Sequence, residues 1–121
     1  FYRSRHETRA LDITAEITKL FVSKCKEKGQ KPLIIIYPTG RSFKRFKRDG
    51  VLAIQPLIEE LNMKGIHYFD LHSEFVGQVD EASFCKLLTQ PGACVGHFNA
   101  AGNSMVADAV LRHINEVGML N

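Results

Sequence analysis

One histidine stands where a catalytic side chain would be expected. His97 follows a glycine and lies two residues before Asn99, in a predicted loop over 92–99. A histidine in such a loop is poorly placed to pack in a core, but it can reach into a cleft and act as a general base near neutral pH. The alternative is an imidazole that bonds only to local backbone, since loops carry both function and plain surface.

A basic segment is the second candidate for chemistry. Residues 41–48 hold five Lys or Arg side chains and two phenylalanines, a composition that can grip phosphates and stack on bases. The whole chain has a net charge of only +3 and no nucleic-acid module signature, so we do not expect nucleic acid as a partner. A solvated loop or the rim of a cleft for an anionic substrate is expected instead. The candidate substrate-binding residues are Thr39, Arg41, Lys44, Arg45 and Asn99.

The elements that must position these residues follow from the spacing of apolar side chains. Helical periodicity predicts helices over 7–28, 52–61, 81–88 and 100–117, with Pro56 in the first turn of the second and Asn99 as the N-cap of the last. The continuous apolar run over 33–37 predicts a strand buried on both faces, and 66–71 predicts a second short strand that ends in a carboxylate. Residues 41–50 show no clean period and predict a loop.

Helices that alternate with buried strands define an α/β fold with a parallel sheet and right-handed crossovers. Ligands in such folds bind outside the carboxyl ends of the strands, where 37–40, 70–72 and 92–99 would meet. Two parallel strands are too few for a covered sheet, so we expect the sheet to be incomplete in this chain. Residues 1–121 then form a single domain or the C-terminal fragment of one.

The segment 96–107 resembles the last conserved block of the SGNH (GDSL-type) esterases and acylhydrolases. There a catalytic histidine precedes a short polar stretch, a glycine and a helix rich in alanine and aliphatics, as His97, Asn99 and Gly102 do here. The order of elements agrees, because 33–38 looks like the fourth strand of the family and 65–71 like the fifth. The resemblance implies a flavodoxin-like three-layer α/β/α fold and hydrolysis of an ester, for example an O-acyl group on a carbohydrate or lipid. His97 would be the general base, and no cofactor is implied.

Two departures from the family pattern bear on the mechanism. The family has an aspartate three residues before the histidine, as the third member of a Ser-His-Asp triad, and here that position is Cys94. Asp70 and Asp80 are the possible acid partners, a Ser-His pair without an acid stays open, and Asp108 on the last helix is a poorer candidate.

The second departure concerns the nucleophile. The Gly-Asp-Ser motif of the family and its oxyanion-hole residues precede the matched region, and the serines of this chain lack that context. We expect the chain alone to be inert, and the missing N-terminal half or self-association through a strand edge to complete the sheet. The alternative is a non-catalytic α/β binding module that uses 41–48 for an anionic partner or a nucleic acid.

The cysteines bear on compartment and metal binding. Three of them, Cys25, Cys85 and Cys94, leave at most one disulfide, and Cys25 is expected as a buried free thiol. This usage favours a reducing compartment, with cytoplasmic and periplasmic locations both open. Cys94 and His97 could ligate zinc together with Cys85 or a nearby histidine, but only one ligand pair is present, so we expect no metal.

Composition and apolar runs exclude two further classes. The chain has 45% apolar and 24% charged residues, which is ordinary for a folded domain and excludes a disordered chain. Its longest apolar run is far shorter than the roughly 20 residues of a membrane span.

Overall fold

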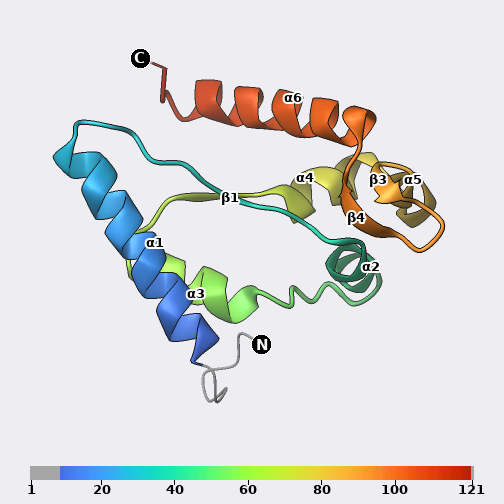
Figure 1. Ribbon diagram of the computed structural model, residues 1–121, viewed down its shortest axis with the longest axis horizontal. Coiled ribbons are helices and arrows are strands. Elements are labelled where there is room, and N and C mark those ends of the chain that lie inside the picture. Colours follow the sequence, from blue (N-terminus) through green and yellow to red (C-terminus); the bar gives the residue numbers. More distant parts are fainter. Residues whose placement is uncertain (1–8, 121) are drawn as a thin grey trace. The chain divides into compact units, whose positions relative to one another are not determined.

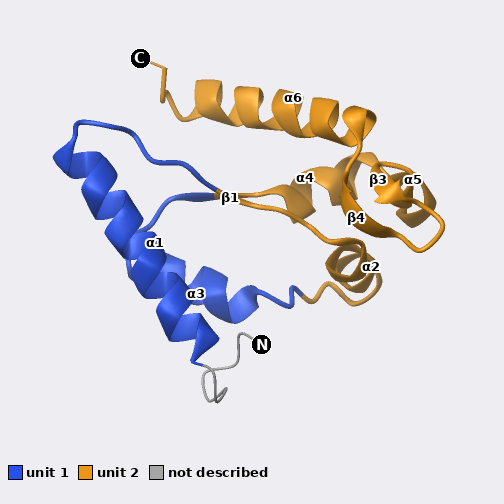
Figure 2. Cartoon of the chain, in the orientation of Figure 1, with its two compact units in different colours: residues 1–34, 52–68 blue, residues 35–51, 69–121 orange. Residues whose placement is uncertain are grey.

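A computed structural model describes residues 9–120 of the chain, which form helices and short strands (Figure 1). In chain order these are α1 (Ala10–Glu27), β1 (Ile34–Ile36), α2 (Gly40–Asp49), α3 (Gln55–Met63), β2 (Tyr68–Asp70), α4 (Leu71–Gln78), α5 (Glu81–Cys85), β3 (Leu88–Gln90), β4 (Val95–Phe98) and α6 (Ala100–Glu116). The chain divides into two compact units, residues 1–34 with 52–68 and residues 35–51 with 69–121 (Figure 2).

The strands form two small sheets in a mixed α/β arrangement. β1 and β2 form a two-stranded parallel sheet, and β3 and β4 form an antiparallel hairpin in which Leu88 pairs with Phe98. No closed sheet is present among residues 9–120. The predicted α/β class is confirmed at this level. β1 is shorter than predicted, and its residues are half-buried rather than buried on both faces.

In the first unit, α1 packs on α3. Leu11 and Ala15 of α1 are buried, as are three apolar residues of α3, namely Leu57, Ile58 and Leu61. At the end of α3, the Lys64 ammonium lies 2.8 Å from a carboxylate oxygen of Glu16. Pro56 lies in the first turn of α3, as predicted, and Gly29 follows α1 in a left-handed conformation with φ +68°.

The predicted apolar face of α1 is only partly buried. Four of its large apolar side chains are about half exposed or more, namely Ile13, Ile17, Leu20 and Phe21. Their spacing places them on one side of the helix. Cys25, expected as a buried thiol, is free but half-buried.

In the second unit, aromatic rings join four elements into one core. Phe43 of α2 stacks on Phe84 of α5 with ring centroids 4.0 Å apart, and both side chains are fully buried. Phe75 of α4 meets Phe84 edge to face at 5.5 Å and stacks on Phe98 of β4 at 5.2 Å. Since aromatic pairs add stability beyond the area that they bury, this cluster fixes α2, α4, α5 and β4 to one another.

The prediction of a loop over 41–50 is wrong, because these residues form α2. The helix begins with a capping box, in which the Ser42 N–H donates to Thr39 Oγ1 and the Thr39 N–H donates to Ser42 Oγ, at 3.1 and 2.8 Å. It ends at Gly50, whose φ of +67° suits a glycine cap. The helical period was missed because it is carried by cations on one face and by only two apolar residues, Phe43 and Phe46, on the other.

Three boundaries around the predicted crevice also differ from expectation. The helix expected over 81–88 ends at Cys85, and the loop expected over 92–99 contains a hairpin turn and β4, so His97 lies on a strand. Residues 71–78 form a helix that the sequence did not predict, whose N-cap is Asp70. The last helix begins after Asn99, as predicted.

Candidate functional site

The His97 side chain is exposed on β4 and lines a cavity of about 300 Å³. The residues around this cavity are Tyr37, Pro38, Thr39, Leu88, Gly96, His97, Phe98 and Asn103. The Tyr37 and Phe98 rings lie with their centroids 6.2 Å apart. The chain that leaves β1 therefore meets the histidine at the carboxyl end of the strand, as the predicted α/β crevice requires.

Close backbone packing holds the histidine strand in place. Gly96 has a φ of +99°, and a Cβ atom built on it would lie 2.2 Å from Thr89 Oγ1, so only glycine fits before the histidine. Asn99 Oδ1 accepts from the Gly102 N–H at 3.0 Å, and its Nδ2 donates to the Lys86 carbonyl at 2.7 Å. Asn99, predicted as substrate-binding, thus uses its amide to join the start of α6 to the backbone of Lys86, which precedes β3.

The structure places both predicted acid partners elsewhere. Asp70 Oδ1 lies 2.8 Å from His72 Nδ1. Asp80 Oδ1 accepts from the Ser83 N–H at 2.7 Å at the start of α5, and this hydrogen bond holds the pKa of Asp80 below its usual value. Among residues 9–120 no carboxylate pairs with His97.

Cys94, at the position where the resembling family has its aspartate, is bonded to Cys85. The disulfide joins α5 to the turn before β4 across a sequence separation of 9 residues, and Cys94 is buried. Bonded sulfurs are not thiolate ligands, and no cluster of three potential metal ligands occurs in the part of the chain that the structure describes. The sequence left one disulfide open, and the structure forms it between Cys85 and Cys94.

Ser42 at the start of α2 is linked by hydrogen bonds to His72 and Asp70 at the start of α4. Ser42 Oγ is 2.8 Å from His72 Nε2, and His72 Nδ1 is 2.8 Å from Asp70 Oδ1. An ionised carboxylate only accepts hydrogen bonds, so Nδ1 is the donor toward Asp70. This is the order of groups in a Ser-His-Asp triad, and no local motif around Ser42 indicates it.

The surroundings of this group favour a structural role. Ser42 Oγ accepts from the Thr39 N–H at 2.8 Å and also lies 3.1 Å from both Thr39 Oγ1 and the Thr39 carbonyl. The His72 side chain is only 1% exposed. A nucleophile needs a lone pair free for attack and a base within reach of substrate, so the three residues serve to fasten the start of α2 to the start of α4.

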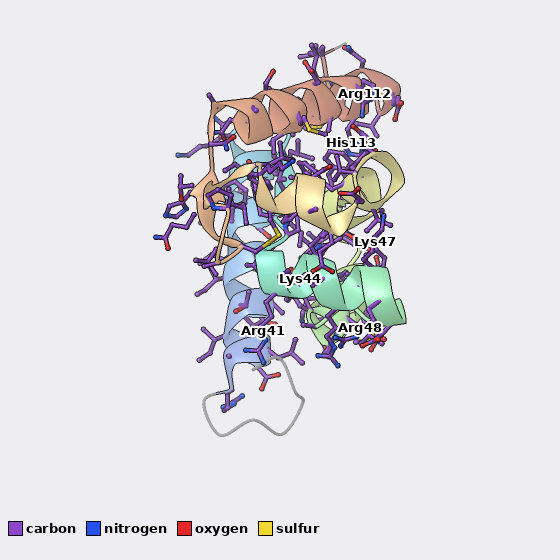
Figure 3. All side chains as sticks on the ribbon, turned by 90° about the vertical axis from the view of Figure 1, so that its right-hand side faces the viewer. Arg41, Lys44, Lys47, Arg48, Arg112 and His113 are labelled. Atoms are coloured by element: carbon purple, nitrogen blue, oxygen red, sulfur yellow. A yellow bond between two sulfur atoms is a disulfide. The ribbon has the colours of Figure 1, made fainter. Side chains whose placement is uncertain are left out.

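A second, larger cavity lies along the basic face of α2. It has a volume of about 670 Å³, and its lining comprises Gly40, Arg41, Lys44, Arg45, Arg48, Asp49, Ala93, Cys94 and Val95. Three of these cations, Arg41, Lys44 and Arg48, project from α2 in Figure 3. The predicted binding residues Arg41, Lys44 and Arg45 thus share one cavity, whereas Thr39 faces the His97 cavity.

The two cavities are lined by adjacent residues of the same two chain segments, which make a tight backbone contact. A Cβ atom built on Gly40 would lie 1.9 Å from the Cys94 carbonyl oxygen. Thr39 and Gly96 line the His97 cavity, whereas their neighbours Gly40 and Val95 line the basic one. A ligand in one cavity would therefore lie next to a ligand in the other.

Comparison with protein-family models gives no match for this chain, and comparison with curated proteins and with solved structures gives none either. The resemblance to the SGNH hydrolases therefore depends on the residues of this chain alone. No helix within residues 9–120 is long and apolar enough to cross a membrane.

Proposed function

We propose that this chain is the histidine-bearing part of a serine ester hydrolase of the SGNH type, with His97 as the general base. The observation that carries the proposal is the exposed His97 side chain in a cavity formed with the residues that follow β1. The segment 96–107, with its histidine, asparagine and glycine, supports the same assignment. The flavodoxin-like α/β/α arrangement, with a sheet completed by further strands, is part of this proposal.

In the proposed reaction, neutral His97 takes the proton of a serine hydroxyl as that hydroxyl attacks the ester carbonyl. The resulting imidazolium then donates the proton to the leaving alcohol, and water repeats the cycle on the acyl-enzyme. The serine belongs to a Gly-Asp-Ser motif outside these 121 residues. A cavity of about 300 Å³ is at the small end of ligand sites, so we expect a short acyl group on a carbohydrate or lipid alcohol.

The acid of the triad needs a different source from the one the family uses. Cys94 is disulfide-bonded, and Asp70 and Asp80 hold helix N-termini, so none of the three serves His97 in the described structure. The proposed enzyme works as a Ser-His pair or receives its acid from another segment.

The test is hydrolysis of p-nitrophenyl acetate by the longest natural protein that contains this chain. We expect His97→Ala to lower kcat by about 10⁶-fold, the order of magnitude found when the histidine of a triad is removed. The matched control is His67→Ala, which removes another exposed imidazole of the same chain. Unchanged kcat in His97→Ala would refute the proposal.

The isolated 121-residue chain provides a second readout. It should not react with a fluorophosphonate probe, which labels activated serines. Labelling at Ser42 would show that the Ser42, His72 and Asp70 group is catalytic and would overturn its structural interpretation.

A non-catalytic binding module is the second candidate, and the basic cavity on α2 is the observation that favours it. Ester hydrolysis by the longer protein that disappears in His97→Ala would exclude it. Absence of hydrolysis, combined with tight binding of an anionic partner, would support it.

A further inference from the structure

The basic cavity has the size and charge of a ligand site. Four cationic side chains and one carboxylate line it, a net of +3 that equals the net charge of the whole chain. Its volume of about 670 Å³ falls in the range of small-molecule sites, roughly 300–1,000 Å³. The charge excess of the chain is therefore gathered around one concave surface.

The spacing of the cations explains why they share this surface. Arg41, Lys44, Arg45 and Arg48 occupy positions i, i+3, i+4 and i+7 of α2, which is one face of a helix. Lys47, outside this face, instead donates to the Val76 and Val79 carbonyls at 3.4 and 3.0 Å.

Two of the four cations make no ion pair among the described residues, although Arg45 also interacts electrostatically with the Asp49 carboxylate. Lys44 lies 3.5 Å from a carboxylate oxygen of Glu81, and Arg48 pairs with Asp49 at 2.8 Å. Arg41 and Arg45 have neither an ion pair nor a hydrogen bond in the described structure. Like charges three and four residues apart destabilise a helix, and a bound anion would remove that repulsion.

The wall opposite the helix is fixed. Ala93, Cys94 and Val95 form it, and the disulfide ties it to α5. The close contact of Gly40 with the Cys94 carbonyl seats the start of α2 directly on this wall. The cations therefore face a preformed hollow rather than an open loop, which lowers the cost of ordering a site on binding.

We infer that this cavity binds a compact ligand with two or more neighbouring oxyanion groups, of the phosphate or carboxylate type. Planar guanidinium groups bind such oxyanions with paired hydrogen bonds, and Arg41 and Arg45 are both available for this. The inference goes beyond the proposed function and does not require it. If the chain is part of an ester hydrolase, the ligand is the anionic portion of the substrate, because Thr39 and Gly96 of the His97 cavity are the sequence neighbours of Gly40 and Val95 in the basic cavity.

The test is isothermal titration of the 121-residue chain with three probes: inorganic pyrophosphate, citrate and acetate. We expect pyrophosphate, citrate or both to bind at least tenfold more tightly than acetate. Which of the two binds more tightly distinguishes phosphate from carboxylate ligands. The Arg41→Gln/Arg45→Gln variant should weaken that binding at least tenfold. The matched control is Lys19→Gln/Lys26→Gln, which removes the same charge from exposed positions of α1 and should change the affinity less than twofold.

Backbone NMR provides a readout that does not depend on the variants. Bound probe should shift the amide signals of Ala93 and Val95, which line the cavity. Equal weakening in both double variants, or no binding of pyrophosphate and citrate, would overturn the inference. A single-stranded oligonucleotide that binds more tightly than either probe, with log affinity falling linearly with log salt, would also overturn it in favour of a nucleic-acid surface.

Discussion

Gly40→Ala tests whether the contact between α2 and the Cys94 turn is as tight as the structure shows. The new Cβ atom would lie 1.9 Å from the Cys94 carbonyl oxygen and 2.9 Å from both its carbonyl carbon and its sulfur. The nearest atom is backbone, so it cannot rotate away. Cys94 is itself held by its disulfide, so the helix must move instead.

The size of the effect follows from two opposing contributions. Atoms this close must separate by about 1 Å, and such overpacking costs roughly 1–3 kcal/mol. Alanine in place of glycine stabilises a helix by up to about 1 kcal/mol through its higher helix propensity. We take the upper value of the overpacking cost, because backbone has to move. The expected net loss in the free energy of unfolding is about 2 kcal/mol, a factor of roughly 30 in the unfolding equilibrium.

Urea unfolding followed by far-UV circular dichroism measures this change. With a slope of about 2 kcal/mol/M, the midpoint should fall by about 1 M. Gly77→Ala is the matched control: Gly77 also lies in a helix, α4, but a Cβ there meets nothing within 4 Å. That variant should be unchanged or more stable by up to about 1 kcal/mol. If Gly40→Ala is as stable as Gly77→Ala, the contact and the rigid cavity wall built on it are both refuted.

Two further predictions concern side chains that fasten helix ends. Ser42→Ala removes the hydrogen-bond partner of buried His72 and should destabilise the chain by about 1–3 kcal/mol in urea unfolding, whereas exposed Ser104→Ala should change stability by less than about 0.5 kcal/mol. Asp80 has a lowered pKa because its carboxylate accepts the Ser83 N–H. The ionised carboxylate therefore stabilises the fold fully above the ordinary aspartate pKa of about 3.9, and this stabilisation is lost as the pH falls through the lowered pKa of Asp80. Asp80→Asn keeps an N-cap side chain that carries no charge, so the free energy of unfolding of this variant should fall less than that of the natural chain between about pH 5 and pH 2. Equal acid sensitivity of the two proteins would contradict the role given to the Asp80 carboxylate.

Sequence patterns predicted the helices that have apolar stripes or clear boundaries. Pro56 and Gly29 set boundaries of the helices in the first unit, and Asn99 sets the start of α6, because each residue acts through its own backbone preference or cap. These signals are local, so they can be read without knowing the tertiary structure.

The elements around the candidate site were harder to predict for a physical reason. α2 carries its period in cations, and the signals that identify it are the Thr39 and Ser42 capping box and the closing Gly50. The β3 and β4 hairpin depends on the pairing of Leu88 with Phe98 and on the Cys85–Cys94 bond, both of which join residues several positions apart. Likewise, no local pattern indicates that Ser42 and His72, thirty positions apart, share a hydrogen bond.

The Cys85–Cys94 disulfide gives this chain a recognisable signature in peptide mapping. Trypsin cuts after lysine and arginine, so it releases peptides 65–86 and 87–112 by cleaving after Lys64, Lys86 and Arg112. Cys85 lies in the first peptide and Cys94 in the second, and the cut after Lys86 falls inside the loop that the disulfide closes. An unreduced digest of the oxidised chain therefore yields the two peptides as one linked species, which reductant separates. Its abundance in material taken from cells reports the redox conditions under which the protein was made.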